Sequence, residues 1–195
     1  MRKQEFLHIS VAAIALALAF TIARFSVNIF GTSMNEIVII FLMSFITVSI
    51  GFIFHELGHR LVAKRFGYAA EFKIWPVGII LALGVSFFGF VFAAPGAVMI
   101  YSKRIENMKI AIKKYGLISL SGPLTNVILA AAFLAMNLFS PSQLFELGFS
   151  INVFLALFNS LPVPPLDGSK IFAWNKGIWA ALFVVLIVLF TFIRF

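Results

Sequence analysis

Residues 37–62 read IVIIFLMSFITVSIGFIFHELGHRLV, an apolar run that leads into His55–Glu56–Leu57–Gly58–His59. A helix needs about 20 apolar residues to cross the core of a bilayer. Ionisable side chains at that depth cost roughly 2.5–3.5 kcal/mol each on insertion scales, so they indicate a functional site. The alternative is an ordinary helix end that protrudes beside Arg60 and Lys64. We favour a membrane-spanning helix with a functional site in its inner half.

The whole chain is too apolar for a soluble domain. Of its 195 residues, 62% are hydrophobic and 11% are charged, and the mean hydropathy is +1.08. A soluble domain of this length needs a polar shell that this composition lacks. We expect one membrane-embedded domain, residues 1–195, that is all-α and polytopic. Its apolar runs predict about five transmembrane helices, at about 6–29, 36–65, 115–138, 144–161 and 178–193.

The first apolar run follows Met1–Arg2–Lys3 and could imitate a secretory signal peptide. The apolar core of a signal peptide has about 7–15 residues. This run continues from Phe6 to about Phe30, interrupted mainly by Arg24, so we interpret it as a retained first helix. The chain contains no cysteine, which excludes disulfides and cysteine-ligated metals.

The segment from about 68 to 101 departs from the helical pattern. Residues 71–74 alternate polar and apolar with the period of a strand, as do Phe88, Phe90 and Phe92 further on. Residues 77–94 are apolar and small, and could pass as a further span, but they contain several glycines. We expect short strands or a re-entrant excursion here. Irregular backbone at membrane depth must be shielded by protein or line a wet cavity, so the segment is expected to border a cleft.

The basic residues favour a segment that does not cross. The net charge is +8, which could suggest nucleic acid, but the positive residues flank apolar segments as topology signals do. If residues 77–94 stay on one side, 13 of the 15 basic residues share that side and only Arg24 and Arg194 face the other. The positive-inside bias then places the amino terminus in the cytoplasm. The shared residues are Arg2, Lys3, Arg60, Lys64, Arg65, Lys73, Lys103, Arg104, Lys109, Lys113, Lys114, Lys170 and Lys176.

The H-E-x-x-H pattern indicates a metal site. Residues four apart on a helix share a face, so His55 and His59 can reach one ion. Glu56, beside the first histidine, can activate a metal-bound water. Zinc hydrolases typically use three protein ligands and leave one position for water.

Asp167 is the best candidate for the third ligand. It is the only aspartate in the chain and follows the prolines of residues 161–166. Those prolines end the preceding helix, and Gly168 permits a tight turn that returns the side chain to neighbouring helices. The alternative is a turn-forming Asp-Gly pair without a metal. The remaining donors fit less well by position; they are His8, Glu5, Glu36, Glu71, Glu106 and Glu146.

Two asparagines lie inside apolar helices. Asn126 and Asn152 could stabilise an oxyanion or hold an extended substrate backbone. Equally, they could form hydrogen bonds between helices, a common use of such side chains in membranes. Asn159, near the proline run, is interpreted as structural.

These motifs together resemble the site-2 proteases, the M50-type intramembrane zinc metalloproteases. The resemblance covers residues 36–170 and rests on residues 55–59, Gly122–Pro123–Leu124–Thr125–Asn126 and Pro165–Leu166–Asp167–Gly168. It implies one zinc ion held by the two histidines and the aspartate, a catalytic glutamate, and assistance from residues matching Asn126 and Asn152. It also implies short strands between the motifs. Extra residues separate Asn159 from Asp167, which weakens any role borrowed for Asn159, and nothing resembles a PDZ domain.

The sequence therefore favours a multi-pass membrane protease of the regulated-proteolysis type. Its partners would be a transmembrane protein substrate and the lipid bilayer, and its active site would face the cytoplasmic half. An extended substrate could add to a strand edge within residues 68–101. A transporter or metal-permeation protein is one alternative, and a catalytically inactive membrane-protein-binding relative is another.

Overall fold

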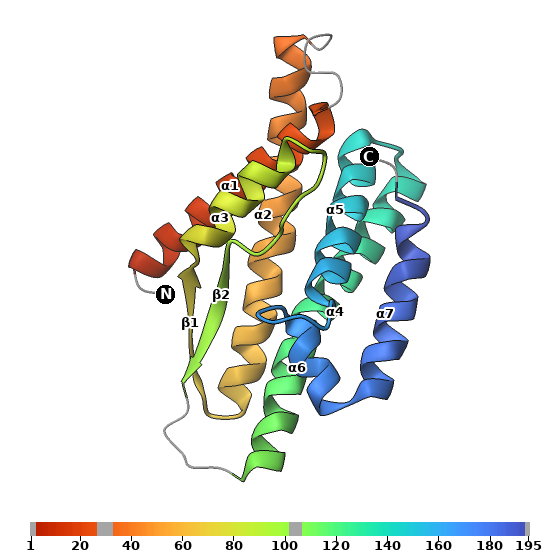
Figure 1. Cartoon of the computed structure of the whole chain (residues 1–195). Coiled ribbons are helices and arrows are strands. Elements are labelled where there is room, and N and C mark those ends of the chain that lie inside the picture. Colours follow the sequence, from red (N-terminus) through yellow and green to blue (C-terminus); the bar gives the residue numbers. More distant parts are fainter. Residues whose placement is uncertain (1–2, 27–32, 102–106, 194–195) are drawn as a thin grey trace.

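The computed structural model describes residues 3–26, 33–101 and 107–193. This part of the chain is mostly helical, with a two-stranded antiparallel sheet (Figure 1). The elements are α1 Lys3–Phe25, α2 Met34–Arg65, β1 Ala69–Ile74, α3 Pro76–Ser86, β2 Gly96–Tyr101, α4 Met108–Phe139, α5 Gln143–Asn159, α6 Asp167–Trp174 and α7 Lys176–Phe190.

Three of the described helices are long and apolar enough to span a membrane. These are α1, α2 and α4. Helices α5 and α7 are apolar but shorter, with 17 and 15 residues. The membrane-protein class is supported, whereas the expected count of about five spans is not confirmed. Large apolar side chains such as Ile128, Leu138 and Phe139 are exposed, as lipid-facing residues would be.

Local capping explains where the long helices begin. Ser33 and Glu36 form a capping box at α2: the Glu36 backbone N–H donates to Ser33 Oγ, and the Ser33 N–H donates to Glu36 Oε2. Asn107 caps α4 by accepting from the Lys109 N–H, so this helix begins seven residues before the expected position 115. The expected start of α1 near 6 is close to Lys3, and its expected end at 29 lies outside the described residues.

The segment between α2 and α4 contains the expected short strands together with a short helix. Strands β1 and β2 pair antiparallel, with Phe72 opposite Val98, and α3 lies between them in the sequence. Eleven residues of helix rise about 16 Å, which is half of the roughly 30 Å core of a bilayer. The alternation at Phe88, Phe90 and Phe92 falls in an irregular connection and not in a strand.

The described basic helix ends lie together. Lys64 and Arg65 close α2, Lys109 and Lys113 open α4, and Lys176 opens α7. Those three helix ends lie at the same end of the molecule (Figure 1). This arrangement agrees with a segment that does not cross. Other residues used in the charge argument, Arg2, Lys103, Arg104 and Arg194, lie outside the described residues.

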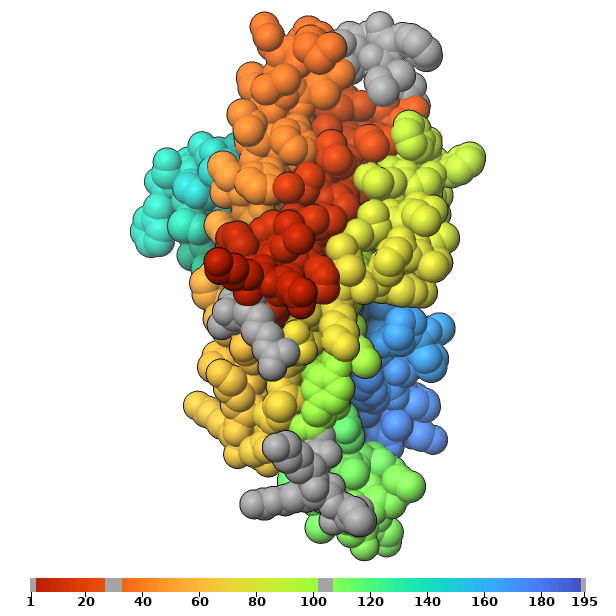
Figure 2. Space-filling view, turned by 90° about the vertical axis from the view of Figure 1, so that its left-hand side faces the viewer, coloured from red at the N-terminus to blue at the C-terminus, as the bar shows by residue number. Residues whose placement is uncertain are grey.

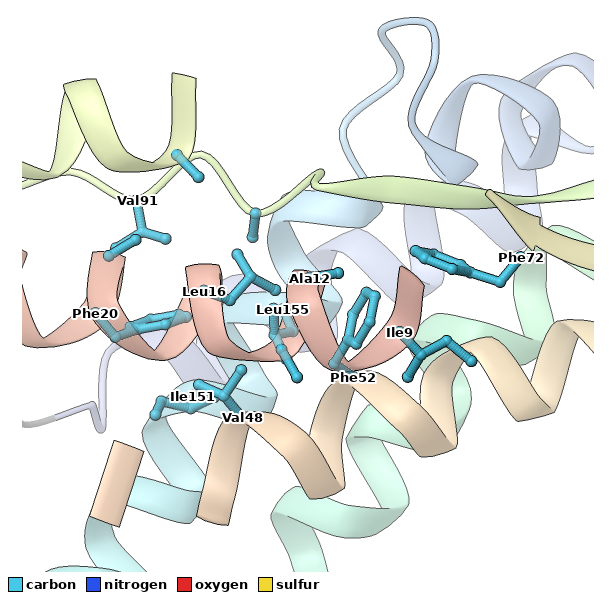
Figure 3. Close-up of a cluster of buried hydrophobic side chains, with 14 residues drawn as sticks. Ile9, Ala12, Leu16, Phe20, Val48, Phe52, Phe72, Val91, Ile151 and Leu155 are labelled. Atoms are coloured by element: carbon cyan, nitrogen blue, oxygen red, sulfur yellow. The ribbon is translucent and has the colours of Figure 1, made fainter. Parts of the chain in front are cut away.

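A cluster of buried apolar side chains packs α1, α5 and the sheet against α2, the helix that carries His55 and His59. It includes Ile9, Leu16, Phe52, Phe72 and Ile151 (Figure 3). In the space-filling view, α1 lies across the face of the molecule between α2 and the 76–95 segment (Figure 2).

A buried ion pair fixes the sheet beside α2. The side chain of Glu5 is buried, and Oε1 accepts from Arg60 Nη1 at 2.9 Å and from the Phe72 N–H at 3.2 Å. One carboxylate thus joins α1, α2 and β1.

Candidate metal centre

His55, His59 and Asp167 converge on one point. The two histidines lie one turn apart on α2, with 3.0 Å between their Nε2 atoms. Asp167 Oδ2 lies 2.9 Å from His59 Nε2 and 3.3 Å from His55 Nε2. One potential ligand atom from each residue lies within 4.8 Å of the others, so the group could hold a metal ion.

Asp167 reaches this point as the first residue of α6. The sequence predicted only a turn here, because three prolines precede the aspartate. A short helix begins instead, and Gly168 packs directly on the backbone of Ser160 and Leu161 at the end of α5, where an added Cβ would clash.

The orientation of His55 is fixed by a relay of amides from α5 through α4. Asn152 Nδ2 donates to the Gly148 carbonyl at 2.8 Å, so its Oδ1 is free to accept from Asn126 Nδ2 at 3.0 Å. Asn126 Oδ1 in turn faces His55 Nδ1 at 2.5 Å. Because an amide oxygen only accepts, Nδ1 of His55 carries the proton and Nε2 presents its lone pair.

His59 is oriented by backbone. Its Nδ1 lies 2.8 Å from the Ile118 carbonyl on α4, so this ring also carries its proton on Nδ1. Two imidazole lone pairs and one carboxylate oxygen therefore face a common point. This donor set fits zinc, which binds histidine nitrogen and carboxylate oxygen and needs only three protein ligands in a catalytic site.

Gly122 is a contributor that residue-type reasoning missed. An added Cβ would lie 2.5 Å from His59 Nε2 and 2.7 Å from His55 Cε1, so only glycine lets α4 approach both rings. The sole sequence signal was its place in the Gly122–Pro123 pair.

Glu56 lies beside the candidate ligands, and one of its carboxylate oxygens has no hydrogen-bond partner among the described residues. Its side chain is buried, and that oxygen is Oε2. Val98 of β2 lines the same cleft as this carboxylate. A cavity of about 20 Å³ is lined by Glu56, His55 and Asn159 among others, and that volume suits one water. A buried carboxylate with a free oxygen beside a water-sized space can accept a proton.

A cleft of about 660 Å³ opens onto the site. Residues 96–100 of β2 line it together with Glu56 and Asp167. Since β1 pairs with one edge of β2, the other edge is unpaired within the described sheet. The segment expected to border a cleft does so.

The expected asparagines lie away from this cleft. Asn126 and Asn152 are fully buried and absent from its lining, and their amide groups serve the relay to His55. This geometry favours a role in hydrogen bonds between helices over contact with an oxyanion. Asn159 does line the cleft, and its Nδ2 donates to the Leu155 carbonyl.

Comparison with known proteins gives the site a context. Residues 43–143, about half of the chain, match peptidase family M50. "Putative zinc metalloprotease MJ0611" of Methanocaldococcus jannaschii is 40% identical over 191 residues, covering 95% of this chain and 92% of that protein. "Putative zinc metalloprotease YwhC" of Bacillus subtilis is 32% identical, covering 65% of each chain.

A further similar protein is "Zinc metalloprotease MJ0392" of Methanocaldococcus jannaschii, 28% identical over 83% of this chain and 42% of that protein. No solved structure matches. The names of these relatives indicate zinc as the metal, and the three long apolar helices indicate an integral membrane protein.

Proposed function

The chain belongs to peptidase family M50, and on that premise we propose that it is an intramembrane zinc metalloendopeptidase. It hydrolyses peptide bonds in the transmembrane segments of other proteins. The observation that carries this proposal is the convergence of His55, His59 and Asp167 beside the unpaired oxygen of Glu56. The matches to zinc metalloproteases support the same chemistry.

The proposed metal ligands and the proposed general base have separate roles. His55, His59 and Asp167 hold one zinc ion per chain, which when bound polarises the scissile carbonyl and makes a coordinated water more acidic. Glu56 accepts the proton of the attacking water at Oε2 and later gives it to the leaving amine. The water-sized cavity beside Glu56 supports this role.

Asn126 and Asn152 act as positioning residues. Their amide relay sets the tautomer and the ring orientation of His55. Neither side chain lines the cleft, so direct contact with the substrate is not part of the proposal.

The substrate is an extended peptide. A helix hides its peptide bonds in its own hydrogen bonds, so a transmembrane segment must unwind locally before it is cleaved. The unpaired edge of β2 lies along the cleft next to Glu56 and can pair with such a strand. Affinity would then come from main-chain hydrogen bonds and tolerate varied side chains.

The proposed topology follows the charges. Helices α5 and α7 cross the membrane together with α1, α2 and α4, and the basic helix ends face the cytoplasm. The amino terminus and the active site then belong to the cytoplasmic half. A transporter would need polar residues along a path, whereas the buried polar groups around the described metal group form one cluster, and an inactive relative would not need Glu56.

The decisive experiment compares wild type with Glu56→Gln. Both proteins should bind one zinc ion, because Glu56 is not a ligand. Cleavage of a single-span substrate in detergent or vesicles should fall about 10²–10⁴-fold in the variant, which is what a general base contributes.

The matched control is Glu71→Gln, since Glu71 lies on β1 and does not line the cleft. That variant should cleave as wild type does. Full cleavage by Glu56→Gln would reject Glu56 as the base, and wild type without zinc would reject the metal centre.

A further inference from the structure

The two oxygens of the Asp167 carboxylate have different neighbours. Oδ2 faces the imidazoles, at 2.9 Å from His59 Nε2 and 3.3 Å from His55 Nε2. Oδ1 lies 3.6 Å from the ammonium nitrogen of Lys170, three residues further along α6. The carboxylate is therefore divided between the metal group and one cation.

Lys170 is held on this side by the turn that carries Asp167. Its Nζ also donates to the Pro165 carbonyl at 3.4 Å. The proline run, the ligand and the lysine thus form one local unit at the wall of the cleft. Among the described residues, Asp167 supplies the only ion pair to Lys170.

The helix dipole does not explain a lysine at this position. Lys170 lies in the first turn of α6, where the helix dipole favours negative charge and disfavours cations. Its side chain is 42% exposed, so it adds little apolar burial. Its favourable charge contact among the described residues is the one to Oδ1 of Asp167.

We propose that Lys170 is a positioning residue that holds Oδ1 of Asp167 and leaves Oδ2 as the single ligand atom of that carboxylate. The inference rests on the proposed function. A catalytic zinc site has three protein ligands and one open position for water or substrate. If Asp167 gave both oxygens, that open position would be crowded, and the partners of a ligating carboxylate commonly decide such geometry.

The test replaces zinc with Co²⁺ in purified full-length protein and records the visible spectrum. Four-coordinate Co²⁺ absorbs more strongly than five- or six-coordinate Co²⁺. Wild type and Lys170→Arg should give the stronger spectrum at one Co²⁺ per chain. Lys170→Met should give a weaker spectrum at the same stoichiometry, and cleavage by its zinc form should fall about 10–100-fold.

The control is Lys176→Met, because Lys176 opens α7, does not line the cleft, and lies 5.2 Å from the Phe172 ring. Its spectrum should match that of wild type. A Lys170→Met spectrum identical to wild type would overturn the positioning role while leaving the protease proposal intact. Failure of wild type to bind Co²⁺ would instead overturn the metal centre itself. Should Lys170→Met not fold, Lys170→Gln replaces it in the same comparison with Lys170→Arg.

Discussion

The two sides of the helical turn that carries His55, Glu56 and His59 differ in how completely their polar atoms are hydrogen-bonded. On the side of α4 and α5, each hydrogen-bonding group from His55 to the Gly148 carbonyl has a partner. On the side of β2, the Glu56 Oε2 atom is buried without a hydrogen-bond partner among the described residues, and the outer edge of β2 lines the cleft without pairing in the described sheet. Paired groups hold the ligands still, whereas unpaired groups are left for water and substrate. The contrast indicates which residues set metal affinity and which set substrate binding.

The largest effect on zinc affinity is expected from overpacking the side of α4, where Gly122 contacts the imidazoles. Gly122→Ala places a methyl group against both imidazoles, and overpacking of this kind costs about 1–3 kcal/mol. Zinc affinity, measured by competition with a chelator, should fall about 100-fold, which corresponds to the upper end of that cost, and cleavage should fall with it. Gly84→Ala is the control, since an added Cβ there meets nothing within 4 Å. Equal zinc affinity in the two variants would show that α4 does not shape the site.

A smaller, graded effect is expected along the relay. Asn126→Ala removes the partner of His55 Nδ1 and should weaken zinc binding about tenfold. Asn152→Ala acts one step further away and should weaken it less. In both variants, KM for the substrate should change less than zinc affinity. A larger effect on KM than on zinc affinity would restore the alternative in which these amides contact substrate.

The smallest effect is expected on the side of β2. It is measured as a change in kcat/KM with variants of the substrate. Proline lacks the N–H that a strand edge requires, and one hydrogen bond contributes about 0.5–1.5 kcal/mol. Single prolines scanned along the unwound segment should reduce kcat/KM about two- to tenfold at every second position. Zinc content stays constant in this series. Sensitivity without a period of two would contradict pairing with β2.

Residue types and spacing were sufficient to single out the chemically distinctive groups, whose metal-binding and catalytic roles stay predictions. The H-E-x-x-H pattern located His55, Glu56 and His59, and Asp167 stood out as the only aspartate. The structure brings the three proposed ligands together. The charge distribution also favoured a segment between α2 and α4 that does not cross, and α3 is too short to do so.

Features made by backbone and by packing could not be predicted in this way. The Ile118 carbonyl and Gly122 act through a main-chain atom and a missing Cβ, which no residue pattern reports. The prolines before Asp167 indicated a turn, although a helix begins there. The Glu5–Arg60 pair joins residues 55 positions apart, and only the tertiary fold brings them into contact.

The three proposed metal ligands come from two helices far apart in the chain, α2 and α6. A bound ion would therefore act as a cross-link between the amino-terminal and carboxyl-terminal halves. Any ion that binds only the folded form adds to the free energy of unfolding, by about 2.7 kcal/mol at a hundredfold excess over Kd. Metal supply would then govern the lifetime of the folded chain in the bilayer as well as its turnover.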